Sequence, residues 1–268
     1  MPEEKSSILK DITKGIAYEI KLPIVSIISS SNLLKKKIDK YITQEEQVYF
    51  NLIIKNSYQV LRYVEHTTNY LMLNEEQKEP IFKKENICDY ILGLCISSEI
   101  FALSKKVMLS VNVPSEPIIM AFNFELLSSA ILNLLSNAIK HSKKENSIKV
   151  SIINEKDFVY IEVSDNGIGI KKEELDKIFL PYYTNSSYSK EYSGGRGLGL
   201  FLVKGIAEMH KGKVEIKSEY GKGTSAIIKI PKNLKENTNH SIGNIIKQNE
   251  LDFSRELKTI VNIELSDI

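Results

Sequence analysis

The sequence lacks the features that mark secreted, metal-binding and nucleic-acid-binding proteins. Among 268 residues it has only two cysteines and four histidines, and its 36 basic residues nearly balance its 34 acidic ones. The two thiols, Cys88 and Cys95, do not make the disulfide framework of a small secreted domain, and no neighbouring histidine or cysteine completes a metal site. A net charge of +2 gives no electrostatic footprint for nucleic acid. We therefore expect two buried, reduced thiols and no nucleic-acid partner.

The sequence also shows no secretion signal and no membrane span. Its first residues, MPEEKSS, lack a signal-peptide pattern, and its longest apolar stretch, 90–103, is interrupted by polar residues and is too short to cross a bilayer. The composition, 42% hydrophobic and 26% charged, is that of a soluble globular chain with room for one large or two ordinary domains. The expectation is a cytoplasmic protein.

Residues 1–79 predict a helical hairpin. Apolar residues recur at helical spacing over 8–38 and again over 48–71, and Thr43 and Glu46 form a capping-box pattern at the start of the second helix. Two helices with one apolar face each leave hydrophobic surface exposed unless a second hairpin covers it. We therefore predict a homodimer or heterodimer held by a four-helix bundle.

Residues 80–233 predict an α+β domain, a two-layer sandwich with helices on one face of a mixed sheet. Helix patterns lie at 87–103, 125–141 and 200–210, and strand patterns at 107–113, 148–153, 159–164, 213–218 and 224–230. Residues 180–195 show no periodicity and are predicted to form a mobile lid, since long loops inside compact domains are often functional. The extension 234–268 has a weak helical pattern, then a β-rich end at 259–263, and no assignable role.

Four short segments of the second region carry the chemistry of a nucleotide site. They are NLLSNAIKH at 133–141, DNGIG at 165–169, GGRGLGL at 194–200 and GKGT at 221–224. An amide oxygen suits Mg²⁺, a carboxylate suits the adenine amino group, and a glycine-rich turn before a helix offers backbone N–H groups to phosphates. Each segment alone has an ordinary explanation as a turn or cap. Together, in this order, they predict an ATP site.

The order and spacing of these segments resemble the catalytic and ATP-binding domain of sensor histidine kinases, within the Bergerat-fold ATPase superfamily. The resemblance covers about 80–233. It implies that Asn137 is the Mg²⁺ ligand and that Asn133 supports the metal and phosphates. It also implies that Lys140 offers charge to the phosphates and that His141 lines the nucleotide site.

The same resemblance implies the remaining nucleotide contacts. Asp165 is expected to recognise adenine, with Gly167 and Gly169 letting the backbone approach the base. The other implied contacts are Phe179 in an aromatic segment before the lid, then Gly195, Arg196, Gly197, Leu198 and Gly199, and finally Gly223 and Thr224. Arg196 stands where relatives often have a small hydroxyl residue, so it either adds a phosphate contact or is simply exposed.

Position 133 discriminates among members of the superfamily. Hydrolysing members generally have a glutamate there that activates water, and an asparagine cannot act as that general base. Asn133 therefore predicts slow hydrolysis, with the phosphate passed to a protein group. This favours a kinase-type domain over a gyrase-, chaperone- or mismatch-repair-type ATPase.

The first helix resembles the dimerisation and phosphoacceptor motif of the same family, with two departures. The matching stretch is GIAYEIKLPIVSI at 15–27. Tyr18 stands where the family has its phosphorylated histidine, and Leu22 stands where it usually has asparagine or threonine. Glu19, the expected acid/base neighbour, and Pro23 are retained. A phenol with a pKa of about 10 is almost wholly protonated at neutral pH, whereas an imidazole with a pKa of about 6.5 is a competent nucleophile, so the usual relay through Tyr18 is not expected.

Four interpretations follow from these residues. The favoured one is an ATP-binding, two-component signal-transduction protein, a pseudokinase that regulates or docks a response regulator or another histidine kinase. The second is an active kinase that phosphorylates a histidine on a partner chain. A plain Bergerat ATPase is disfavoured by Asn133 and the hairpin, and a structural bundle with a dead nucleotide site is disfavoured because no ligand of the site is lost. His66, on the second helix, is a poor substitute acceptor.

Overall fold

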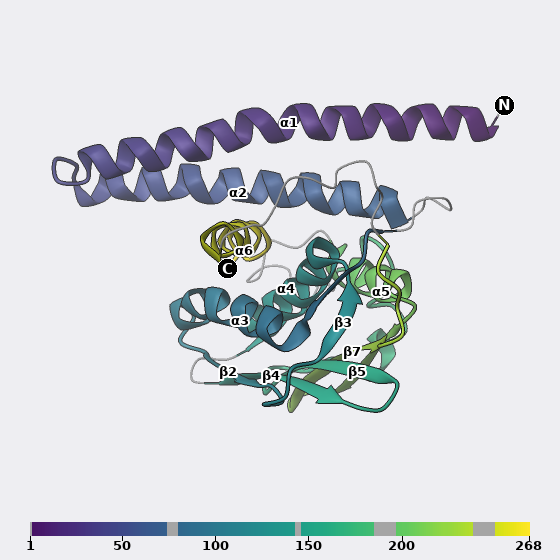
Figure 1. The fold of residues 1–268 in the computed structure, drawn as a ribbon. Coiled ribbons are helices and arrows are strands. Elements are labelled where there is room, and N and C mark those ends of the chain that lie inside the picture. Colours follow the sequence, from purple (N-terminus) through teal and green to yellow (C-terminus); the bar gives the residue numbers. More distant parts are fainter. Residues whose placement is uncertain (1, 74–79, 143–145, 185–196, 238–249) are drawn as a thin grey trace. The chain divides into compact units, whose positions relative to one another are not determined.

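A computed structural model divides the chain into two compact units, which are described separately (Figure 1). The structure describes residues 2–73, 80–142, 146–184, 197–237 and 250–268. Unit 1 comprises Met1–Glu76 together with Asn262–Asp267, and unit 2 comprises Gln77–Val261 and Ile268. The C-terminal segment therefore contributes residues to both units.

Unit 1 is the predicted helical hairpin, which the structure confirms. Helix α1 spans Pro2–Ile38, with Pro23 inside it, and α2 spans Gln44–Leu73. The predicted capping box is formed as well, because the backbone N–H of Thr43 donates to Oε2 of Glu46 at 2.7 Å and the N–H of Glu46 donates to Oγ1 of Thr43 at 3.2 Å. The two reciprocal bonds fix the start of α2 directly after the turn.

The hairpin exposes much of its apolar surface. Large apolar side chains that are exposed on both helices include Ile12, Ile16, Ile20, Leu34, Val48, Leu52 and Ile53. Water contact with so many apolar side chains is unfavourable. A single hairpin therefore does not bury its own hydrophobic face.

Unit 2 is built around a mixed five-stranded sheet with the strand order β2-β4-β5-β7-β6. The strands are β2 (Met108–Asn112), β4 (Ser147–Asn154), β5 (Phe158–Asp165), β6 (Lys213–Glu219) and β7 (Gly223–Pro231). β2 and β4 are parallel and the other pairs are antiparallel. Helices α3 (Ile87–Ser104), α4 (Phe124–His141) and α5 (Gly199–Met209) cover one face (Figure 1). The predicted two-layer α+β sandwich is confirmed.

A small second sheet was not predicted from the sequence. It pairs β1 (Lys83–Asn86) with β3 (Ile119–Phe122) in antiparallel register. A short helical turn, η1 (Lys172–Glu174), follows the segment at 165–169. The part of the predicted lid at 185–195 lies outside the described residues, whereas residues 180–184 form neither helix nor strand, as predicted for a loop.

Helix α3 is the one helix among the described residues that is long and apolar enough to cross a membrane, judged by length and composition alone. In unit 2 it is a core helix, since Ile87, Ile91 and Leu94 are fully buried. It packs against α4 and β2. Burial in unit 2 accounts for the apolar residues of this face, whereas Ile96, Ile100 and Leu103 of the same helix are exposed.

The β-rich interpretation of residues 259–263 is wrong. They belong to helix α6 (Glu250–Glu264). Of the weak helical pattern at Ile242, Ile245, Ile246 and Leu251, only Leu251 lies among the described residues, in α6. Leu257 and Val261 are buried, and a methyl group at Gly93 of α3 would lie 3.1 Å from Cδ1 of Leu257. Burial of one helix face outweighs the modest helix propensity of the β-branched residues at this end.

Candidate functional site

Helix α4 carries the first set of predicted nucleotide residues. Its start is fixed by Asn123, whose side chain accepts a hydrogen bond from the backbone N–H of Leu126 at 2.9 Å. Asn137 and Lys140 are half-buried near its C-terminal end, and no other described residue forms a hydrogen bond with the Asn137 side chain. The Asn137 amide therefore offers an oxygen that the fold has not used.

Asn133 is placed differently from Asn137 on the same helix. Its side chain is buried, and its Nδ2 donates to the carbonyl oxygen of Ser129 at 2.8 Å. Its Oδ1 lies at the beginning of α5, because a methyl group at Gly199 would be only 2.7 Å from that oxygen. The structure thus brings the α4 amide and the glycine-rich segment together, as the prediction of one shared site requires.

Asp165 ends β5 and is held in place by backbone donors. The N–H of Gly167 donates to its Oδ1 at 2.8 Å, and the N–H of Thr224 also hydrogen-bonds to the carboxylate. Thr224 lies opposite Asp165 in the β5–β7 register. Burial raises the pKa of Asp165 above its usual range, and the two backbone hydrogen bonds oppose that shift. Asp165 is a half-buried carboxyl with a fixed orientation.

Three glycines bring backbone segments close together beside Asp165. A methyl group would lie 2.4 Å from the carbonyl oxygen of His141 if placed at Gly167, and 2.1 Å from that of Glu219 if placed at Gly169. At Gly223, where φ is +120°, it would lie 2.0 Å from the carbonyl oxygen of Asp165 itself. The end of α4, the turn after β5 and the β6–β7 turn therefore converge at positions where only glycine fits.

The side chain of Ser218, which was not predicted as a site residue, links the turn after β5 to the β6–β7 turn. Oγ of Ser218, on β6, accepts a hydrogen bond from the N–H of Ile170 at 2.8 Å and lies 2.9 Å from Oγ1 of Thr224. The N–H of Gly221 donates to the carbonyl oxygen of Ile168 at 2.7 Å. Ser218 sits in an ordinary alternating strand pattern, so no signal in the sequence distinguishes it.

The remaining predicted nucleotide residues are spread over turns and helix ends. Gly197, with φ of +69°, lies against the carbonyl oxygen of Tyr183, where a methyl group would be 2.4 Å away. Leu198 is buried and directly precedes α5, while Phe179 is half-buried in the turns after η1. Gly195 and Arg196 lie outside the described residues.

His141 closes α4 next to the turn after β5. Burial lowers the pKa of His141, and the neighbouring Lys140 lowers it further. The carbonyl oxygen of His141 accepts a hydrogen bond from the N–H of Ile168 at 3.1 Å. A neutral imidazole beside the glycine turn is consistent with a lining role and adds no charge to the site.

The structure places the predicted acceptor residues in unit 1, on α1, whereas the nucleotide residues lie in unit 2. Tyr18 and Glu19 are both exposed, and 65% of the Tyr18 surface is accessible. An exposed tyrosine on a helix has no structural requirement for its phenol ring. The position can therefore be substituted without disturbing the hairpin.

Replacing Gly223 with alanine is expected to destabilise unit 2 by roughly 2–4 kcal/mol. The new methyl group would clash with the backbone carbonyl of Asp165, and a φ of +120° is strained for alanine. Gly221→Ala is the matched control: it also has a positive φ, of +88°, but its methyl group would meet nothing within 4 Å. That change should cost about 1 kcal/mol. Urea unfolding of both variants checks the difference, and equal losses would contradict the close packing.

Comparison with known proteins gives one family match for unit 2. The model of the histidine kinase-, DNA gyrase B- and HSP90-like ATPases matches residues 123–234. That range contains α4, Asp165 and the β6–β7 turn. The match to this ATPase family therefore covers the segments that converge at the site.

Similarity to curated relatives extends over both units. The chain is 26% identical to the sensor protein KdpD of Clostridium acetobutylicum, over 86% of this chain and 25% of that protein. It is 29% identical to sporulation kinase D of Bacillus subtilis, over 85% of this chain and 43% of that protein. The chain thus spans between a quarter and less than half of the length of these relatives.

The fold is also found among solved structures. Full-length ShkA in complex with AMPPNP matches with a TM-score of 0.65 and 18% identity, over 85% of this chain and 47% of that one. At this identity the likeness concerns the fold alone. It covers the helical hairpin as well as the α+β unit, since neither unit by itself amounts to 85% of the chain.

Proposed function

Because this chain belongs to the sensor histidine kinase family, we propose that it binds ATP and Mg²⁺ in unit 2 and uses the nucleotide to regulate or dock a signalling partner. The observation that carries the nucleotide proposal is the placement of Asp165. Its carboxylate is held by two backbone N–H groups, in a turn whose glycines let three backbone segments pack together beside it. Such a carboxylate can accept a hydrogen bond from the adenine amino group.

The residues present fit a Mg²⁺-nucleotide. Among the described residues there is no cluster of three or more histidine, cysteine, aspartate or glutamate side chains that would hold a metal ion alone. Mg²⁺ commonly takes one or two protein oxygens and completes its shell with water and phosphate, so the unused Asn137 amide suits it. Lys140 on the same helix, and the backbone N–H groups at the start of α5, would hold the phosphates.

The chain's own residues limit what the bound nucleotide can do. Asn133 offers no general base for activating water, so we expect slow hydrolysis. On α1, Tyr18 replaces the usual histidine, and Leu22 replaces the residue that the family associates with dephosphorylating a partner. We therefore propose a pseudokinase role at the usual acceptor position, with ATP binding setting the state of the helical hairpin.

The hairpin is proposed to form a four-helix bundle with a second chain, either a copy of itself or another histidine kinase. The support is the exposed apolar surface of α1 and α2, which a single hairpin leaves in water. A response regulator is the other proposed partner. This chain spans less than half of the length of these curated relatives, so both partners are proposals.

An alternative function follows from the same residues. Because the sequence keeps every residue expected of the nucleotide site but has tyrosine instead of histidine at position 18, unit 2 could transfer phosphate to a histidine on a partner chain. The discriminating observation is where a labelled phosphate ends up when such a partner is present.

Calorimetric titration with ATP tests the nucleotide proposal. We expect binding in the presence of Mg²⁺ and about tenfold weaker binding when EDTA removes the metal or when Asn137 is replaced by alanine. Asp176→Asn, at an exposed position of the same unit, is the control and should bind like the wild type. If the wild-type chain shows no binding of ATP with Mg²⁺, both the regulatory and the kinase proposals fail.

A further inference from the structure

The last residues of the chain lie on the helical hairpin. Asn262–Asp267 belong to unit 1, together with α1 and α2, although they follow the ATPase-family segment in the sequence. Oγ of Ser266 donates to the carbonyl oxygen of Ile263 at 2.7 Å, which closes the turn after α6. This short segment, 262–267, is named the C-terminal clasp.

An apolar side chain anchors the clasp. Ile263 is buried in a cluster with Ile28 of α1 and Leu61 of α2, and Ile24 and Tyr58 pack around it. The side chain therefore enters the groove between the two helices of the hairpin. Burial of this isoleucine removes its apolar surface from water, which favours the docked position.

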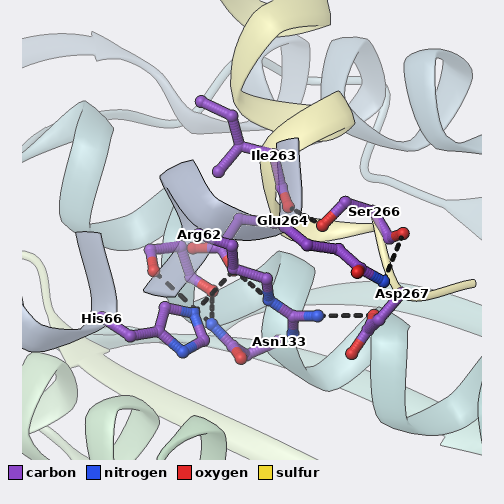
Figure 2. A network of polar contacts seen from close by, with 9 residues as sticks. Arg62, His66, Asn133, Ile263, Glu264, Ser266 and Asp267 are labelled. Carbon is purple, nitrogen blue, oxygen red and sulfur yellow. Dashed lines mark hydrogen bonds and ion pairs between the residues drawn. The ribbon is translucent and has the colours of Figure 1, made fainter. Parts of the chain in front are cut away.

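A buried ionic network fixes the clasp beside this anchor (Figure 2). Arg62 of α2 pairs with two carboxylates, since its Nε lies 3.3 Å from Oε2 of Glu264 and its Nη1 lies 2.5 Å from Oδ1 of Asp267. Nε2 of His66 lies 2.9 Å from the same oxygen of Glu264. Arg62, His66 and Glu264 are each at least nine-tenths buried.

A backbone contact completes the recognition. Nε2 of Gln59, on α2, donates to the carbonyl oxygen of Ser266 at 3.3 Å. Gln59, Arg62 and His66 recur at intervals of three and four residues, so they form one stripe on α2. The side chains of this stripe bind the carbonyl oxygen of Ser266 and the carboxylates of Glu264 and Asp267. The groove beside the stripe accommodates the side chain of Ile263.

An acidic segment can dock at this place on the hairpin only if its carboxylates are paired with cations, because Glu65 of α2 already lies nearby. Burial raises the pKa of Glu65 on α2; Lys21, at 3.4 Å, opposes the shift, and Glu264 adds to it. A further carboxylate at this place therefore needs a cationic partner, which Arg62 supplies to both Glu264 and Asp267. Breaking a buried pair by removing one partner typically costs several kcal/mol, since an uncompensated charge remains.

We propose that the Gln59–Arg62–His66 stripe and the adjoining groove form a docking site for an acidic, amphipathic helix end, and that the C-terminal clasp is its occupant in the same chain. The site is close to the acceptor position, because Ile24 and Ile28 follow Tyr18 by about 9 and 15 Å along α1 at a rise of 1.5 Å per residue. A partner helix of similar chemistry has to displace the clasp. That consequence for partners rests on the proposed function, whereas the docking itself does not.

A fluorescent peptide with the sequence of residues 250–268 tests the site on the full-length chain. In the wild type the clasp occupies the site, so the peptide should bind weakly. In the full-length variant Glu264→Gln/Asp267→Asn the chain's own clasp is weakened, and the peptide should bind at least about tenfold more tightly. Adding Arg62→Gln to that variant should abolish the gain. A peptide with Lys258→Ala, at an exposed position of α6, is the matched control and should bind like the natural peptide.

Two results would overturn the proposal. One is equal peptide binding by the wild type and the Glu264→Gln/Asp267→Asn variant, and the other is a gain that survives Arg62→Gln. Hydrogen exchange of the wild-type chain gives a readout that needs no variant: we expect amides 262–267 to be protected, and exchange at unfolded-chain rates would equally overturn the docking. ATP titration separates the two proposals, since none of the substituted positions is one of the predicted nucleotide residues.

Discussion

Replacing Asp165 with asparagine is expected to weaken ATP binding roughly 100-fold. In the wild type, the N–H groups of Gly167 and Thr224 fix the carboxylate, which leaves its remaining lone pairs for an adenine amino group. An asparagine must turn its oxygen toward those backbone donors, so its NH₂ group then faces the base. A donor facing a donor leaves both groups unpaired. Calorimetric titration of the variant with ATP and Mg²⁺ measures the loss.

The same substitution is expected to leave unit 2 as stable as before, or more stable, at neutral pH. Burial raises the pKa of Asp165, so this carboxyl favours folding below its unfolded pKa, and that contribution is lost as pH rises through the folded value. At pH 7 the ionised group therefore costs stability in the absence of ligand. Thermal unfolding of the ligand-free proteins should show the advantage of Asp165→Asn growing from pH 4 to pH 7. A variant that loses both binding and stability would contradict a ligand-recognition role for Asp165.

Replacing Tyr18 with histidine is expected to turn a chain that does not label itself into one that does. An imidazole with a pKa of about 6.5 has an available lone pair at neutral pH, whereas a phenol with a pKa of about 10 is almost wholly protonated. Tyr18 is exposed, so the smaller ring requires no repacking, and the neighbouring Glu19 is retained as the acid/base group. Incubation with γ-labelled ATP should give acid-labile label, rising from background to a measurable fraction of the chains.

Two controls make this prediction specific to position 18. Tyr41→His, at an exposed tyrosine outside both helices of the hairpin, should gain no label, since only position 18 matches the acceptor motif. The double variant Tyr18→His/Asp165→Asn should lose most of the label at an ATP concentration that just saturates the single variant, because it binds ATP more weakly. If Tyr18→His binds ATP normally but stays unlabelled, Tyr18 is not the residue that prevents self-phosphorylation.

The sequence predicted most elements of the fold because their patterns are long and regular. The two hairpin helices and the strands of the five-stranded sheet carry clear periods, and Thr43 with Glu46 marked the start of α2 correctly. The small sheet escaped notice since β1 has only four residues, of which Lys83, Lys84 and Glu85 are exposed. Its place depends on pairing with β3, which is a tertiary effect.

The sequence predicted those site residues whose type is hard to explain by the fold alone, namely the glycines in turns and the carboxylate of Asp165. The structure brings Asp165, Gly167, Gly223 and Thr224 together, although more than fifty residues separate the two segments. Ser218 was not predictable, because a serine in an alternating strand gives no signal of its hydrogen bonds across two turns. The clasp was not predicted either, because Arg62 and Glu264 come together only in the folded chain. In addition, the β-branched residues 259–261 favoured a strand over the helix that the structure shows.

Incubation of the purified wild-type chain with γ-labelled ATP and Mg²⁺, after calorimetry has established binding, decides whether Tyr18 prevents self-phosphorylation. The chain should bind the nucleotide and remain unlabelled when alone. Acid-labile label on the wild-type chain alone would contradict the conclusion that Tyr18 prevents self-phosphorylation, and label that appears only on an added histidine-bearing partner would favour the kinase alternative over the regulatory role.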